Sequence, residues 1–224
     1  MVDWSRAIPG YGTLQVWRGS GTASGETDER GMVAATENLS YPVACIWNPT
    51  DSGVGHASVF IRAAEGAFPE DDTRSYASLF PGTDVDTGRS GARREHLKPG
   101  RMLTGEANSF REDCALESGK KAEGCYRLPD HMIPLGNLDQ LRMQAAWNAI
   151  RDKPEMHYRL LRKNCATIAA RIIRAGMEKK QLVTSPLLTH KAWWTPHDVL
   201  LLSRSCQSKD QKRRMGELID ALGI

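Results

Sequence analysis

The sequence predicts an α+β fold in which a central antiparallel sheet packs against helices. Two observations support this prediction. Strand-like segments occur up to about residue 135, and amphipathic helical patterns dominate the rest of the chain. The composition, 40% hydrophobic and 25% charged residues, is ordinary for a globular protein. We therefore expect residues 1–224 to form a single domain.

Four segments are predicted as strands. Residues 41–47 and 55–63 are rich in apolar and β-branched side chains, and residues 73–80 end at a Pro-Gly pair. These three are expected to form an antiparallel meander. The fourth segment, residues 125–135, contains prolines, which predict an edge strand or an interrupted one.

Two regions show little periodicity. Residues 1–39 form a lead-in punctuated by glycines. Residues 83–124 carry many charges and several glycines, and they are predicted to be an insertion or a long loop. Loops of that length often border a functional cleft.

Three helices are predicted in the second half of the chain. Residues 137–151 carry a rough apolar stripe. Residues 165–175 form a stronger one, with Asn164 as the amino-terminal cap and Gly176 as the stop. A last helix is expected to begin at Thr195, followed by a proline at its first position.

Cys165 is the candidate nucleophile. The thiolate is the reactive form of cysteine, and the positive end of a helix dipole and a nearby imidazole both favour it. Cys165 stands in the first turn of the predicted helix, directly after its cap, and Arg162 and Lys163 add positive potential. Small buried cysteines are common in protein cores, so position alone does not settle the role.

His56 is the candidate base among six histidines. It opens a predicted strand directly after Gly55, and the glycine permits another backbone or a substrate to come close. A histidine there can point over the end of the sheet toward a helix. His157, eight residues before Cys165, is the reserve candidate.

These motifs resemble a known family. G-H-A-S at residues 55–58, Y-A-S-L-F-P-G at 76–82 and N-C-A-T at 164–167 are similar to motifs of circularly permuted papain-like proteins related to NlpC-type peptidoglycan peptidases. His56 precedes Cys165, as in lecithin-retinol-acyltransferase-like proteins, whereas unpermuted members have the reverse order. The resemblance implies a papain-like fold of the permuted NlpC type.

The resemblance also implies further site residues. A third polar side chain on the strand after the histidine would orient the imidazole, and Ser78 is the first choice and Ser75 the second. The backbone N–H of Cys165 would form one half of an oxyanion hole. Asn164 would either supply the second donor or serve only as the helix cap.

The function implied is a cysteine hydrolase, an amidase or endopeptidase that cleaves peptidoglycan stem peptides. Because the amino terminus lacks the pattern of a secretory signal, we expect synthesis in the cytoplasm and delivery into a rival's periplasm by a contact-dependent machine such as type VI secretion. Two alternatives stay open: a thiol acyltransferase or lipid-cleaving enzyme of the same fold, and a catalytically inactive binding module.

Partners and cofactors follow from the same patterns. The effector hypothesis implies an immunity protein and a secretion carrier as partners. The net charge of +3 comes with no nucleic-acid-binding module, and no apolar run is long enough to span a membrane. The sequence holds no Walker-type loop or zinc-binding helix, so no cofactor is expected. Cys114 and Cys125 are candidates for a local disulfide.

Overall fold

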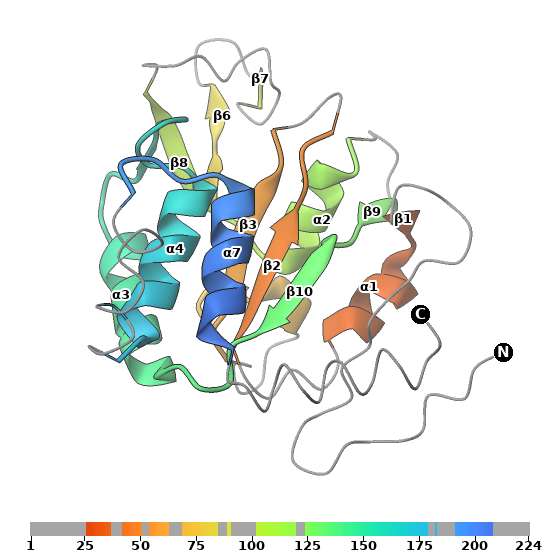
Figure 1. Cartoon of the computed structure of the whole chain (residues 1–224). Coiled ribbons are helices and arrows are strands. Elements are labelled where there is room, and N and C mark those ends of the chain that lie inside the picture. The colour runs from red at the N-terminus through yellow and green to blue at the C-terminus, as the bar shows by residue number, and fades with distance from the viewer. Residues whose placement is uncertain are drawn as a thin grey trace, which may run out of the picture.

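The computed structural model describes residues 26–36, 42–50, 54–62, 69–84, 89–90, 102–119, 124–178, 182 and 191–207. Within these residues the fold is α+β, with antiparallel sheets packed against helices (Figure 1). Most of the lead-in predicted at 1–39 lies outside the described residues.

The main sheet has four strands in the order β10-β2-β3-β4, all antiparallel. Their bounds are β2 Val43–Trp47, β3 His56–Phe60, β4 Tyr76–Ala77 and β10 His131–Pro134. The pairing of Trp47 with His56 places the end of β2 beside the start of β3. The predicted meander is therefore confirmed, and His56 stands at one end of the sheet.

A second sheet continues the first, because β5 follows β4 after one residue. Its order is β11-β8-β5, and smaller antiparallel pairs join β1 to β9 and β6 to β7. The bounds are β5 Leu79–Pro81, β8 Leu103–Ala107, β11 His157–Tyr158, β1 Glu26–Thr27, β9 Tyr126–Arg127, β6 Thr83–Asp84 and β7 Arg89–Ser90.

A layer of helices lies beside one face of the main sheet (Figure 1). Helices α4 Cys165–Gly176 and α7 Pro196–Cys206 pack on the sheet, and α3 Gln140–Arg151 packs against α4. Helix α4 packs directly on β3. It presents the small side chains of Ala166, Ala169 and Ala170, all fully buried, and these let helix and strand approach closely. The predicted helices are confirmed to within a few residues.

The other face of the sheet carries a separate apolar cluster. Here α2 Phe110–Glu117 packs against β9 and against the short 3₁₀ helix η1 Pro69–Asp71, and α1 Glu29–Thr36 contacts η1. Met32 and Phe110 pack with Trp47, Phe60 and Tyr76 from the sheet. Alternate residues of β3 thus face different layers, since Ala57 and Val59 belong to the cluster beside α4.

One segment differs from its prediction, and another agrees with it. The described part of residues 83–124, predicted as an insertion or long loop, includes β8 and α2. Both are short, so neither leaves a long periodic pattern in the sequence. Residues 125–135 form two strands, β9 and β10, separated at Leu128–Asp130, as an interruption at Pro129 requires.

Candidate active site

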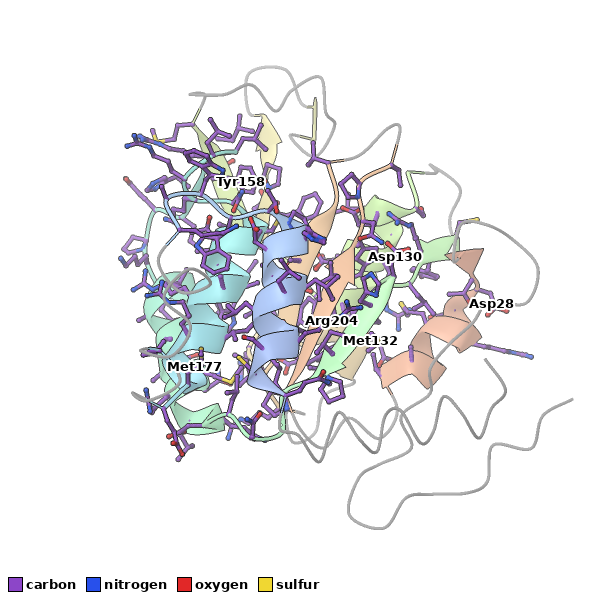
Figure 2. The ribbon with its side chains drawn as sticks, in the orientation of Figure 1. Asp28, Asp130, Met132, Tyr158, Met177 and Arg204 are labelled. Atoms are coloured by element: carbon purple, nitrogen blue, oxygen red, sulfur yellow. The ribbon has the colours of Figure 1, made fainter. Side chains whose placement is uncertain are left out.

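Cys165 occupies the first position of α4 and is 6% exposed. Figure 2 labels Tyr158 near this end of the helix and Met177 near the opposite end. The strong apolar stripe of the helix holds it on the sheet, and Asn164 fixes where the helix begins. The thiol is therefore set at the positive end of a well-packed helix.

Asn164 acts as the cap, and its side chain is fully engaged. Its Oδ1 accepts hydrogen bonds from the backbone N–H and the hydroxyl of Thr167, each at 2.7 Å. Its Nδ2 donates to the carbonyls of Leu160 at 2.7 Å and Trp194 at 3.0 Å. Both amide protons are used, so the side chain has no donor left for an oxyanion. The geometry therefore supports the role of Asn164 as the helix cap and not as the second oxyanion donor.

Replacing Asn164 with alanine is expected to lower the free energy of unfolding by about 2–3 kcal/mol, because the helix loses its cap and two buried carbonyls lose their donor. Asn164→Ser is the matched control, since it keeps a cap acceptor and removes the amide donor without adding a charge. Urea denaturation measures both. Equal losses in the two variants would show that the cap itself contributes nothing.

His56 begins β3 and is 1% exposed. Gly55 before it has φ +79°, and a Cβ there would lie 2.6 Å from the carbonyl oxygen of Trp47. The glycine predicted to allow a close approach is thus required by the neighbouring strand's backbone. The imidazole is held between aromatic rings, with centroids 4.9 Å from Phe80 and 5.4 Å from Trp47.

Two side chains contact Nε2 of His56. The Oδ2 of Asp113, from α2, lies at 2.9 Å, and the Oγ of Ser78 lies at 3.0 Å. Ser78, the first choice for an orienting residue, therefore reaches the imidazole. Ser75 instead donates its backbone N–H to Asp72, and its carbonyl accepts from Ile61.

Cys165 lies close enough to His56 to influence the pKa of the imidazole. Burial lowers the pKa of His56, but the charge of Asp113 and the charge and hydrogen bond of Cys165 outweigh it, so this pKa lies well above its ordinary value of 6.5. The chain thus brings together a thiol from α4, an imidazole from β3 and a carboxylate from α2. Because Asp113 engages Nε2, the other ring nitrogen is left for the sulfur.

Asp113 is held by a buried network of its own. The hydroxyl of Tyr76 donates to its Oδ2 at 2.7 Å and is itself hydrogen-bonded to Ser58. The Oδ1 of Asp113 is buried and has no partner among the described residues. A buried carboxylate oxygen without a donor is costly, and such groups concentrate at functional sites.

Tyr158, on β11, lies near Cys165. It is almost fully buried, and burial, followed by the charge and hydrogen bond of Cys165, raises the pKa of its hydroxyl well above the ordinary value. The phenol therefore stays protonated at neutral pH and provides an O–H donor beside the sulfur.

Sequence reasoning missed Asp113, Tyr76 and Tyr158. A signal for Asp113 existed: Ser109 and Glu112 have the spacing of a capping box, which the structure contains at the start of α2. That motif predicts a helix exactly where no periodicity is visible. Tyr158 belongs to a strand of only two residues, which leaves no periodic pattern in the sequence, so its position near Cys165 depends on the fold.

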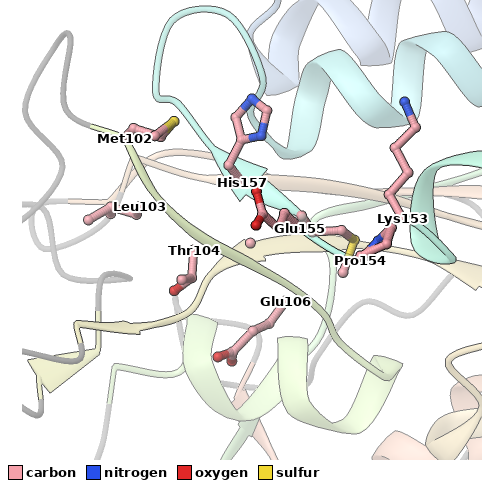
Figure 3. A pocket seen from close by; sticks show the side chains of 10 residues that line it. Met102, Leu103, Thr104, Glu106, Lys153, Pro154, Glu155 and His157 are labelled. Atoms are coloured by element: carbon pink, nitrogen blue, oxygen red, sulfur yellow. The ribbon is translucent and has the colours of Figure 1, made fainter.

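His157 does not join the cluster. Its Nδ1 lies 3.5 Å from Nζ of Lys163, and it lines a cavity of about 850 Å³ between the start of β8 and residues 153–157 (Figure 3). Met102, Thr104 and Glu106 line the facing side. Because His157 and Tyr158 are neighbours on a strand, their side chains point to opposite faces. The cavity therefore lies on the face of β11 opposite the face that carries Tyr158.

The raised pKa of His56 makes folding stability depend on pH. The folded protein holds this proton more tightly than the unfolded chain, so the stabilisation is complete below about pH 6.5 and is lost as pH rises through the folded-state pKa. We expect the urea-derived free energy of unfolding to fall from about pH 6.5 upward. In Asp113→Asn the decline should be much smaller, and an undiminished decline would contradict this account.

Cys114 and Cys125, the candidates for a disulfide, are separate thiols in the structure. Cys114 is buried in α2 beside the apolar cluster, whereas Cys125 is partly exposed. Among the described residues no group of three His, Cys, Asp or Glu side chains is placed to hold a metal ion. No helix in that part of the chain has the length and apolar character needed to cross a membrane.

Comparison with known proteins links part of the chain to bacterial toxins. The family model of the IcsB middle domain matches residues 130–220, fewer than half of the chain. The multifunctional-autoprocessing repeats-in-toxin of Vibrio cholerae serotype O1 is 31% identical over 97 residues, which are 40% of this chain and 2% of that toxin. The toxin of the same name from Vibrio vulnificus matches with the same figures.

The chain thus spans about 2% of the length of these toxins, and it contains a region homologous to a part of them. The segment matched by the IcsB model includes Tyr158 and Cys165 but not His56 or Asp113. No solved structure matches the chain.

Proposed function

We propose that the chain is a cysteine-dependent acyl-transfer enzyme and that it serves as an effector domain of the bacterial toxin type. The observation that carries the proposal is the buried pair of His56 and Asp113, 2.9 Å apart, set near Cys165 at the start of α4. A nucleophile, a base and a group that orients the base are the parts that covalent catalysis by cysteine needs. The histidine strand before the cysteine helix also supports a permuted papain-like fold of the NlpC type.

The reaction starts from the thiolate of Cys165 paired with the imidazolium of His56. The sulfur attacks an acyl carbonyl, and the resulting tetrahedral intermediate collapses to a thioester as His56 gives its proton to the leaving amine. His56 then takes a proton from water, the hydroxide attacks the thioester, and a carboxylic acid is released while the thiol is restored. Asp113 keeps the imidazole oriented and stabilises its charged form.

Two donors are available for the oxyanion of the intermediate. The backbone N–H of Cys165 is one of the free donors at the start of a helix. The hydroxyl of Tyr158, which lies near the sulfur, is the second. With the amide of Asn164 committed to the cap, Tyr158 fills the role for which Asn164 was considered.

The first candidate activity is amide hydrolysis, with peptidoglycan stem peptides as the substrate implied by the resemblance to NlpC-type peptidases. Similarity to a region of secreted toxins supports delivery to another cell. A toxin that cuts the producer's own wall would require an immunity protein. The periplasm of the target cell is the compartment in which such a substrate is reached.

The test is to trap the acyl-enzyme. The protein is incubated separately with purified muropeptides, a peptide amide, a long-chain acyl thioester and phospholipid vesicles, and then quenched in acid. Mass spectrometry of the proteolysed protein should show an added acyl mass on the peptide that contains Cys165. This mass should appear with only one of the four acyl donors. An acyl mass on any other cysteine, or none with any donor, would argue for the inactive binding module.

A second candidate, acyl transfer to an acceptor other than water, is favoured by the burial of the site. Cys165 and His56 are 6% and 1% exposed, and excluding water from a thioester protects it from hydrolysis. Adding a primary amine or a lysine-containing peptide to the trapped acyl-enzyme separates the two candidates. Aminolysis that outpaces release of the free acid identifies a transferase, whereas free acid alone identifies a hydrolase.

A further inference from the structure

Three of the large apolar side chains that the structure exposes lie on segments around the amino end of α4. Met102, Leu161 and Trp193 are 57%, 50% and 64% exposed. The remaining exposed large apolar residues in the described part are scattered over the helices: Leu116 on α2, Leu141 on α3 and Leu201 on α7. A local group of exposed apolar side chains marks an interaction surface.

Backbone pairing and hydrogen bonds join the three segments. Tyr158 pairs with Leu103, so the start of β8 lies beside the turn that follows β11. That turn, closed by the bridge between Arg159 and Lys163, carries Leu161 at its tip. Asn164 binds the carbonyls of both Leu160 and Trp194, which ties the turn to the segment of Trp193.

The same turn is basic. Arg159 and Arg162 are exposed, Lys163 is partly exposed, and within the described residues none of the three forms an ion pair with an acidic side chain. Burial and the nearby charges of Lys153 and Arg171 lower the pKa of Lys163, which shows that positive charge accumulates here. Among the described residues, Glu155 and Glu106 line the cavity behind the turn, and Asp198 pairs with Lys191.

We propose that Met102, Leu161, Trp193, Arg159, Arg162 and Lys163 form a docking face for an anionic lipid membrane. Exposed tryptophan and leucine side chains enter the boundary between headgroups and acyl chains, and arginines beside them attract negatively charged headgroups. The chain's net charge of +3 adds to that attraction. Figures 1 and 2 show the amino ends of α4 and α7 at one end of the molecule, so docking there orients the Cys165 end of the enzyme toward the bilayer.

The proposal predicts binding that depends on charge and is independent of catalysis. The full chain carrying Cys165→Ala is sedimented with vesicles of phosphatidylcholine, with and without phosphatidylserine. We expect binding to be at least about tenfold tighter with phosphatidylserine and to weaken as salt rises. The double variant Arg159→Glu, Arg162→Glu should remove that gain, because each substitution is expected to weaken binding to these vesicles by about fivefold or more. Trp193→Ala should weaken binding to both kinds of vesicle.

Two controls match these changes elsewhere on the surface. Arg204→Glu reverses an exposed charge in the last turn of α7, and Leu141→Ala removes a side chain that is 75% exposed near the far end of α4. Neither should alter vesicle binding by more than about twofold. The proposal is overturned if phosphatidylserine does not tighten vesicle binding, or if the controls weaken binding as much as the turn variants. It is also overturned if the turn variants lose affinity for nucleic acid and not for vesicles. Because the thiol is absent throughout, failure of the proposed chemistry would leave these results unchanged.

Discussion

Cys165→Ala is expected to abolish acyl transfer, with kcat/KM reduced by about 10⁴- to 10⁶-fold on whichever donor forms the adduct. The sulfur is the atom that becomes acylated, and no neighbouring group in the described site can replace it. The rate of product formation and the mass of the Cys165 peptide measure the loss. Circular dichroism should show an unchanged fold, since the substitution removes one small atom from a site that is still capped by Asn164.

Two comparisons make this result specific. Cys125→Ala makes the same chemical change at a partly exposed thiol outside the site and should leave the rate within about twofold. His56→Ala should approach the loss seen for Cys165→Ala, and the double variant should be no worse, because residues that act as one unit do not give additive losses. Activity within tenfold of the wild type in Cys165→Ala would exclude this thiol as the nucleophile.

Much of the site was visible in the sequence because its elements are locally determined. The position of Cys165 follows from a strong apolar stripe and a capping asparagine, and both are properties of a dozen adjacent residues. His56 follows from a strand bounded by Gly55, whose backbone conformation demands glycine. Ser78 was placed by its position on the next strand, and it does contact the imidazole.

What the sequence did not reveal depends on packing between distant segments. Helix α2 is eight residues long and only weakly amphipathic, so it left no stripe to detect, and Asp113 appeared as one charge among many in residues 83–124. Its partner His56 is 57 positions away along the chain. Likewise, Arg159 and Arg162 appear as ordinary surface charges until the fold sets Trp193 and Met102 beside their turn.

Asp113→Asn is expected to lower kcat by roughly 10³- to 10⁴-fold while leaving KM nearly unchanged. Asparagine fits the space and still accepts a hydrogen bond, but it cannot stabilise the imidazolium that accompanies the thiolate. The rate at which iodoacetamide alkylates Cys165 at neutral pH should fall as well, because less of the thiol is held as an ion pair. Peptide-resolved mass spectrometry measures this rate without a substrate, and Cys125 in the same sample provides the internal reference.

Ser78→Ala is the comparison that decides which side chain orients the base. Both Ser78 and Asp113 lie at hydrogen-bond distance from Nε2 of His56, at 3.0 and 2.9 Å. Only the carboxylate contributes a charge, and in a buried site the interaction between charges is far stronger than a neutral hydrogen bond. We therefore expect Ser78→Ala to cost no more than about tenfold in kcat. A loss equal to that of Asp113→Asn would instead assign the orienting role to the serine, as the family resemblance implied, and would leave Asp113 as a buried structural charge.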